Sequence, residues 1–237
     1  MKNVIALLII FLCLVTGLSA MDMSLGGGFH FDMNTGSGLK YEFGNENKYS
    51  LGYDVMSFGG FLFFDLSYAI IDINFAFGSI GMVCKENGKR IDFVDNERQA
   101  GNMTQLGFSI LGKYPMEMGS ITFFPLLGIN YNMVLTLKDK NGETQQEGDD
   151  NGELVDVNPS TWNQFGILAG IGLDFPFNDN LFLRGQVLFQ MRLPTSDRSE
   201  MADKWNKYAK DIGETGLKAT ATAGFGPRIQ IGIGYKF

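Results

Sequence analysis

The last nineteen residues of the chain, Ala219–Phe237, read ATATAGFGPRIQIGIGYKF. Every second residue counted back from the C-terminus is mostly apolar, and the residues between them are mostly glycine or polar. Because successive side chains of a β-strand leave opposite faces, this period of two predicts one strand over residues 219–237. Such a strand is well beyond the usual length, which indicates that it spans or closes a larger structure. The apolar set is Phe237, Tyr235, Ile233, Ile231, Ile229, Pro227, Phe225, Ala223 and Ala221.

Alternation alone fits two kinds of β-barrel. A soluble barrel turns its apolar face inward, whereas a membrane barrel turns that face toward lipid. The opposite face here carries Gly224, Gly226, Gly232 and Gly234, and a soluble exterior normally carries mixed charges instead. Glycine suits the crowded interior of a narrow barrel. We therefore expect the apolar face to meet a membrane.

The N-terminus has the pattern of an export signal. Lys2 is followed by an apolar run over residues 4–15 and by small residues at 17–20, which predicts a signal peptide over residues 1–20 that is cleaved after Ala20. The apolar run is too short for a membrane-spanning helix. The mature barrel domain is then expected to comprise residues 21–237. The formal net charge of −7 argues against a nucleic-acid partner, since such proteins need a basic surface.

The two cysteines, Cys13 and Cys84, do not form a disulfide framework. Cys13 lies in the signal peptide, with lipid attachment at this residue as an alternative. Cys84 is then unpaired in the mature chain. We expect it to be a loop thiol, with disulfide-linked dimerisation as the alternative.

Seven further segments alternate in the same way and are expected to form strands. The connections between the eight strands are alternately long and short, and Pro125 suggests a bulge because proline cannot donate to a central ladder. Short periplasmic turns and longer extracellular loops are typical of outer-membrane barrels. The predicted fold is all-β, an eight-stranded antiparallel up-and-down transmembrane β-barrel with four extracellular loops. The segments are 24–34, 54–67, 71–78, 103–113, 121–137, 162–175 and 181–193, with a loop and protruding hairpin over 35–53 and a short polar helix over 201–210.

The C-terminal sequence, together with the export signal, resembles the bacterial outer-membrane family of small β-barrels, which includes OmpX, OmpW and the OmpA membrane domain. In that family a C-terminal phenylalanine, preceded by apolar or aromatic residues at alternate positions, is read by the barrel-assembly machinery. Ile231, Ile233, Tyr235 and Phe237 match this assembly signal. The resemblance implies a location in the bacterial outer membrane, with its lipid and the assembly machinery as partners. Its motif covers only the last strand and fixes no activity.

Charged residues on the inward faces of the strands predict two interior clusters, because buried charges destabilise a protein unless they are paired. One cluster lies toward the long loops, near the ends of strands that become neighbours on closure. The other lies toward the short turns, where arginine and lysine are expected to neutralise carboxylates. The first consists of Asp32, Arg192 and Arg228, and the second of Asp65, Asp72, Asp174, Arg184 and Lys236.

Three functions remain in view for such a barrel. A filled interior favours a structural or surface-interaction role through the loops, with an extracellular ligand as partner. The alternative is a narrow channel of the OmpW type for small solutes, helped by the inward glycines. Enzymatic activity is not expected, because the single histidine, His30, faces inward beside Asp32. No cofactor and no metal site are expected.

Two acidic loop segments, Asp139–Glu143 and Asp149–Glu153, place carboxylates around Asn-Gly. They lack the ligand number of a calcium loop, so turns explain them, with weak divalent-cation binding as the alternative. Aromatic residues near the strand ends are expected to form interfacial belts. These are Tyr53, Tyr68, Tyr131, Tyr235, Trp162 and Tyr49, the last with loop packing as the alternative.

Overall fold

A computed structural model of the chain describes residues 23–43, 47–91, 101–139, 141–144, 146–148, 154–156, 158–214 and 216–237. Within these residues the chain forms thirteen strands, one α-helix and one 3-10 helix. The expected signal peptide, residues 1–20, lies outside the described residues. Within the described part of the chain, no helix is long and apolar enough to cross a membrane.

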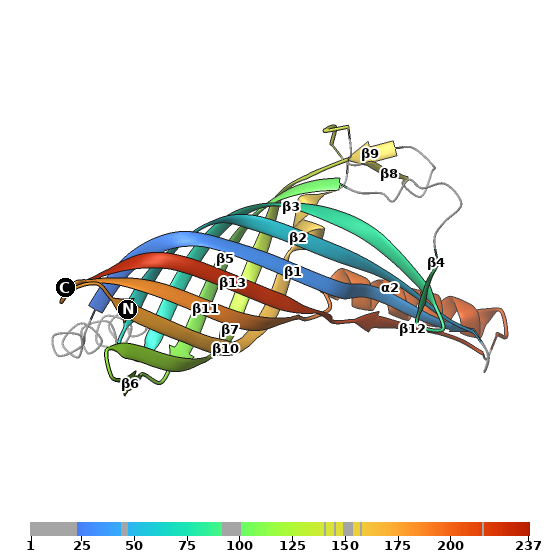
Figure 1. Cartoon of the computed structure of the whole chain (residues 1–237). Helices are drawn as coiled ribbons and strands as arrows, with labels where there is room; N and C mark the ends of the chain where they lie inside the picture. The colour runs from blue at the N-terminus through green and yellow to red at the C-terminus, as the bar shows by residue number, and fades with distance from the viewer. Residues whose placement is uncertain are drawn as a thin grey trace, which may run out of the picture.

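Eight long strands pair antiparallel in a closed ring, each with its neighbours in the sequence, and the last strand pairs with the first (Figure 1). The observed all-β fold therefore contains the predicted strands, in the predicted order. In ring order the strands are β1 (Met23–Phe43), β2 (Asn47–Leu66), β3 (Ala69–Glu86), β5 (Gly101–Lys113), β7 (Ile121–Lys138), β10 (Gln164–Pro176), β11 (Leu181–Arg192) and β13 (Gly224–Lys236).

The expected total of eight strands is too low, because five short strands lie outside the ring. Two of them pair with β3 and β7, two pair with each other, and one pairs with β1. The predicted strand over residues 219–237 is also interrupted at Ala223, where the chain leaves one pairing with β1 and begins the next. The short strands are β4 (Lys89–Ile91), β6 (Met116–Met118), β8 (Gln146–Gly148), β9 (Leu154–Asp156) and β12 (Leu217–Thr222).

The strands are inclined to the axis of the ring. Inward residues followed from strand to strand, starting at Ser24 of β1, lead to Gly226 of β13. A Cβ atom on Gly226 would lie 2.9 Å from the Cα of Asn34. The circuit therefore returns to β1 ten residues further on, at 34 instead of 24. Ten residues at ~3.3 Å each, over eight strands ~4.8 Å apart, give a tilt of about 40°, as closed sheets require.

The alternation of the sequence separates the two faces of the ring. On β13 the residues are alternately buried and exposed along almost the whole strand. Ile231 and Ile233 are 57% and 53% exposed on the outer face, whereas Arg228 and Gln230 are buried inside. An inward apolar face, the soluble alternative, is inconsistent with this arrangement.

One expected loop segment is mostly strand. Residues 35–53 were expected as a loop with a protruding hairpin, and the hairpin is present: Ser37 to Phe43 pair with Asn47 to Tyr53, beyond a register shift after Asn34, so that β1 and β2 are longer than expected. We call this part, with β12 and the helix α2 (Ser196–Asp211), the extension (Figure 1). It projects at the end of the ring away from the C-terminus, which we call the loop end; the opposite end is the turn end.

A small core holds α2 on the strands of the extension. Leu39 of β1 packs with Ala202 and Ala219, and the Asn206 side chain bonds to both backbone groups of Ala219, at 2.7 and 3.0 Å. The helix begins before the expected position 201 because the Thr195 side chain caps it by accepting a hydrogen bond from a first-turn amide.

Pro125 does not mark a bulge, which corrects the expectation. The β7–β10 register runs without a break past its pair with Ile171. The Pro125 carbonyl accepts a hydrogen bond from the Tyr114 amide, so its nitrogen faces the edge where β5 has ended at Lys113. No ladder donor is needed there. The β5–β7 register shifts instead near Thr104.

Candidate functional site

The interior of the ring is filled by apolar side chains near the turn end. Three phenylalanine rings of this layer lie where inward glycines leave room for them. A Cβ atom on Gly26, Gly172 or Gly234 would come within 2.4 Å of a ring carbon. These glycines therefore accommodate aromatic rings and do not widen a path, contrary to the sequence-based argument for a channel. The layer consists of Phe61, Phe63, Ile70, Leu111, Phe124, Leu126, Leu168, Phe182 and Leu188.

Arg184 of β11 is the centre of a charged cluster beside this apolar layer. Its guanidinium donates to both oxygens of Asp174, from Nε at 2.7 Å and from Nη2 at 2.6 Å. Asp174 is its direct partner on β10. Arg184 also donates across the interior to Asp65 of β2. Asp65 accepts a second bond, at 2.7 Å, from the Nζ of Lys113. The cluster therefore joins four strands, and its arginine is 1% exposed.

The same guanidinium is surrounded by aromatic rings. Its central carbon lies 4.5 Å from the ring centre of Phe63 and 5.1 Å from that of Phe182, and the Phe124 ring is at 5.2 Å. Such contacts are favourable when the cation is removed from water. Arg184 thus links the ion pairs to the apolar layer.

Two predicted members of this cluster lie apart from its ion pairs. Asp72 of β3 is fully buried, and neither carboxylate oxygen has a hydrogen-bond partner among the described residues. Lys236 lies at the half-exposed end of β13, where its backbone bonds to Asn180. The position assigned to it beside the carboxylates is occupied by Lys113, because Lys113 ends the inward-facing series of β5.

The second predicted cluster contains one strong ion pair. Asp32 and Arg228 are direct partners on β1 and β13, and they form two hydrogen bonds of 2.7 and 3.0 Å. Arg228 also donates to the Ser109 hydroxyl at 3.3 Å. His30 Nε2 lies 3.9 Å from the Asp32 carboxylate, enclosed in the interior.

Arg192, the third residue of the predicted cluster, lies near enough to Asp32 and Arg228 for their charges to interact, but it forms no ion pair with Asp32. Arg228 already takes both oxygens of Asp32. Arg192 is paired instead with glycine backbone on β10 and β13, and its Nη1 donates to the amide oxygen of Gln164 at 3.1 Å. It is 2% exposed and forms no ion pair with a described carboxylate.

Between the two ends the interior is lined by amides. Six of these side chains are buried, and their nitrogen and oxygen atoms have no hydrogen-bond partner among the described residues. Such groups are costly inside a protein unless they are hydrated or bonded. The interior therefore has a polar middle layer. Its amides are Asn74, Asn130, Asn132, Gln186, Gln190 and Gln230.

A second apolar layer lies toward the loop end. Tyr53 and Trp162 pack on it with ring centres 4.8 Å apart, and the Arg198 guanidinium of α2 lies 5.4 Å from each ring centre. Tyr53 and Trp162 therefore pack on the interior and are not part of an outer aromatic belt. The layer consists of Val55, Ile80, Met103, Val134 and Leu137.

The outer face of the ring is apolar from strand to strand. The expected belt residues Tyr131 and Tyr235 are exposed there, and Tyr68 is exposed in the turn between β2 and β3. Tyr49 lies instead in the extension, where its hydroxyl donates to Glu86 at 2.7 Å. The four residues of the assembly signal also project outward: Ile231, Ile233, Tyr235 and Phe237.

The remaining sequence expectations concern metals and thiols. Within the described residues, no group of acidic, histidine and cysteine side chains could hold a metal ion. Asp139 uses its carboxylate to accept bonds from the amides of Asn141 and Glu143, at 2.8 and 2.9 Å, as in a turn. The segment 149–153 lies outside the described residues. Cys84 is a free thiol in β3 and not in a loop.

Sequence reasoning missed Lys113, Ser109 and Gln164. Lys113 and Ser109 share the inward parity of Leu111 on β5, so parity would have placed both inside. The bond that joins Gln164 to Arg192 crosses between β10 and β11, and strand order and register together are needed to find it.

The comparisons with known proteins find similarity to solved structures only. No protein-family model matches the sequence, and no curated protein is significantly similar to it. Among solved structures, the chain is similar to the outer membrane protein OprG from Pseudomonas aeruginosa, with 13% identity, coverage of 92% of this chain and 96% of OprG, and a TM-score of 0.48. The translocator domain of the autotransporter NalP from Neisseria meningitidis has 14% identity, coverage of 95% and 92%, and a TM-score of 0.31. The transport unit of the autotransporter AIDA-I from Escherichia coli has 12% identity, coverage of 92% and 89%, and a TM-score of 0.29. None of these similarities assigns a function to the chain.

Proposed function

We propose that this chain is an integral protein of the bacterial outer membrane, an eight-stranded up-and-down transmembrane β-barrel with a structural or surface-interaction role. The observation that carries the proposal is the sidedness of the closed ring. Large apolar side chains such as Phe29 and Phe58, 80% and 66% exposed, cover the outer face. Buried arginine, aspartate and amide side chains lie on the inner face, together with two apolar layers. Lipid would cover the apolar outer face, and closure of the ring leaves no strand edge with unpaired backbone groups in the membrane.

The filled interior supports a role at the surface. Apolar layers lie at both ends of the polar middle layer, and Arg184 ties the turn-end layer to carboxylates on two other strands. A barrel of this strand number is about filled by its own side chains. The extension with α2 then supplies an exterior surface, together with the loops, for an extracellular ligand.

Outer-membrane lipid and the barrel-assembly machinery complete the proposed partners. The outward side chains of Ile231, Ile233, Tyr235 and Phe237 are accessible to an assembly factor before insertion. Catalysis is not part of the proposal, because His30 is enclosed beside Asp32 and Arg228.

Reconstitution of the purified, folded protein tests this function. We expect insertion into lipid vesicles, a folded gel mobility that is lost on boiling, and no steady unitary conductance in planar bilayers. A protein that remains soluble and folded without detergent contradicts the membrane assignment. Steady conductance contradicts the filled interior and favours the alternative.

That alternative is a narrow channel for small solutes. Its specific support is the polar middle layer, where buried amides such as Asn130 and Gln190 have no partner among the described residues. Water or a polar solute would bond to such groups. Conduction requires the apolar layers to open, so substitution of Phe124 by alanine should raise conductance only if the channel proposal is right.

A further inference from the structure

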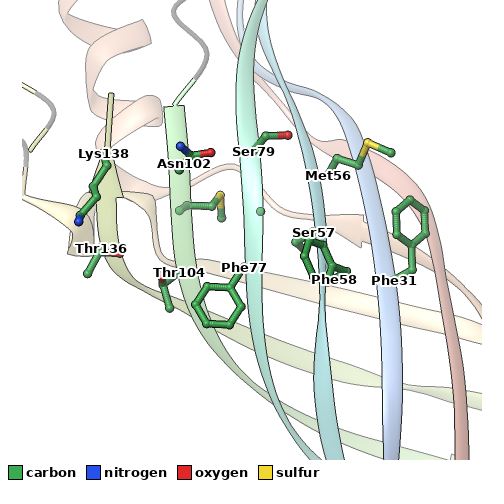
Figure 2. A pocket seen from close by; sticks show the side chains of 12 residues that line it. Phe31, Met56, Ser57, Phe58, Phe77, Ser79, Asn102, Thr104, Thr136 and Lys138 are labelled. Carbon is green, nitrogen blue, oxygen red and sulfur yellow. The ribbon is translucent and has the colours of Figure 1, made fainter. Parts of the chain in front are cut away.

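A groove of about 710 Å³ crosses the outer face of the ring near the loop end (Figure 2). Its lower wall is one row of directly paired residues on five successive strands: Phe31, Phe58, Phe77, Thr104 and Thr136. The first three are aromatic, and the last two carry hydroxyl groups. The row therefore changes from apolar to polar along its length.

The next row of residues toward the loop end also changes from apolar to polar along its length. It runs through Met56, Ser79, Asn102 and Lys138, again as direct partners on neighbouring strands. Figure 2 shows Lys138 and Asn102 on the β7 and β5 side of the groove, and Met56 on the opposite side. The polar residues of both rows thus lie together, and so do the apolar ones.

The tilt of the strands gives this gradient a component along the axis of the ring. The circuit that begins at Ser24 returns to β1 nearer the loop end, at Asn34. Each step from β1 toward β7 at a tilt of about 40° therefore rises roughly 3 Å, or about 12 Å over four steps. Lys138 and Thr136 lie higher on the axis than Phe31, on the side of the long loops.

A register shift shapes the polar end. The β5–β7 ladder shifts beside the pair of Thr104 with Thr136, so that Leu135 is an extra residue on β7. Such bulges bend a sheet and redirect side chains. After the shift, Leu137 is buried and Lys138 is exposed on the outer face.

Lys138 gives the polar end a positive charge. It forms no ion pair with a described residue, and the adjacent Asp139 carboxylate is engaged by amides of its own turn. Asn102, Thr104 and Thr136 line the same end of the groove and add amide and hydroxyl groups. Together they provide donors for a phosphate group.

We propose that this groove binds one lipid of the outer leaflet that bears a phosphate and a net negative charge, with the phosphate at Lys138 and Asn102 and an acyl chain on Phe58 and Phe77. The proposal rests on the membrane location proposed above. A lipid of that leaflet has its charge toward the exterior and its chain toward the membrane centre, as the groove requires. A soluble anion would not cover the exposed rings of Phe58 and Phe77, and an apolar ligand would not contact the charge of Lys138.

Fluorescence quenching by lipids with brominated chains tests the proposal. A Phe58→Trp reporter is placed in the full folded protein, in phosphatidylcholine vesicles that contain brominated phosphatidylglycerol or brominated phosphatidylcholine. The signal is the quenching in excess of the protein without the reporter. We expect phosphatidylglycerol to be preferred about fivefold, the effect of one lysine near an anionic lipid surface.

Charge variants locate that preference. Lys138→Glu, or Lys138→Gln if the first does not fold, is expected to bring the preference to about one or below. Lys85→Glu reverses the charge of an exposed strand lysine outside the groove and is expected to leave the preference unchanged. An equal preference in the Lys138 variants, or none in the protein with Lys138, overturns the proposal.

A second reporter separates the groove from the membrane assignment. Ile231→Trp lies on the outer face of β13, and any brominated lipid should quench it. If it is quenched but position 58 is not, something other than lipid covers the groove and this proposal alone fails. If neither position is quenched, both proposals fail.

Discussion

Replacement of Arg184 by methionine is the sharpest test of how the interior is held together. The change removes both bonds to Asp174 and the bond to Asp65. Asp65 keeps Lys113 at 2.7 Å, whereas Asp174 loses its direct partner. Loss of one member of a buried ion pair costs about 3–5 kcal/mol, because a charge is left uncompensated. We expect the free energy of unfolding to fall by about that amount.

Arg192→Met is a matched control for this change. Arg192 is on the same strand and equally buried, but among the described residues its side chain bonds only to Gln164 and forms no ion pair with a carboxylate. Replacing an unpaired buried cation by an apolar side chain is expected to be neutral within about 1 kcal/mol, or stabilising. Urea unfolding in lipid vesicles, followed by tryptophan fluorescence and gel mobility, gives both values. Equal losses, or a larger loss for Arg192→Met, would refute the reasoning.

Three further results are expected. Gly28→Ala should destabilise the barrel by more than about 1 kcal/mol, because the added Cβ would lie 2.0 Å from a β13 carbonyl oxygen. Gly185→Ala is the control: a Cβ there has nothing within 4 Å, so this change should be near neutral in the same unfolding assay. Deletion of Phe237 should lower the fraction of folded, membrane-inserted protein in cells, measured by heat-dependent gel mobility, and an unchanged fraction argues against the assembly signal. The Glu86 carboxylate accepts the Tyr49 hydroxyl bond and raises the pKa of that phenol, so Glu86→Gln should lower this pKa in an NMR titration.

Alternation was a strong guide to the strands because both faces of the ring are constrained. The outer face exposes large apolar side chains such as those of Ile231 and Ile233. On the inner face, close packing leaves room only for glycine at positions 232 and 234. Parity therefore placed Asp32, Arg228, Asp65 and similar residues inside. It also identified partners where the strands are neighbours, as for Asp32 with Arg228.

The remaining errors arise where position along the strands matters. Gly and Asn between residues 34 and 53 indicated a loop with a protruding hairpin; the hairpin is present, but the pairing of β1 with β2 makes both strands longer than expected. Lys113, and not the expected Lys236, lies beside the Asp65 carboxylate, because parity gives a face and not a register. The filling of the glycine positions by Phe63, Phe124 and Phe182 is likewise a matter of packing between strands, which a single sequence does not reveal.

The central claim, that lipid meets the outer face and protein fills the inner one, is tested most directly by spin labels on β11. Single cysteines at positions 187, 188, 189 and 190, in a background without other cysteines, are labelled in the folded protein in lipid vesicles. Val187 and Phe189 are exposed, whereas Leu188 and Gln190 are buried. We predict high collision rates with oxygen, which concentrates in lipid, at 187 and 189, and low rates with oxygen and with a water-soluble nickel reagent at 188 and 190. The reverse alternation, or access of the nickel reagent to 187 and 189, contradicts the account.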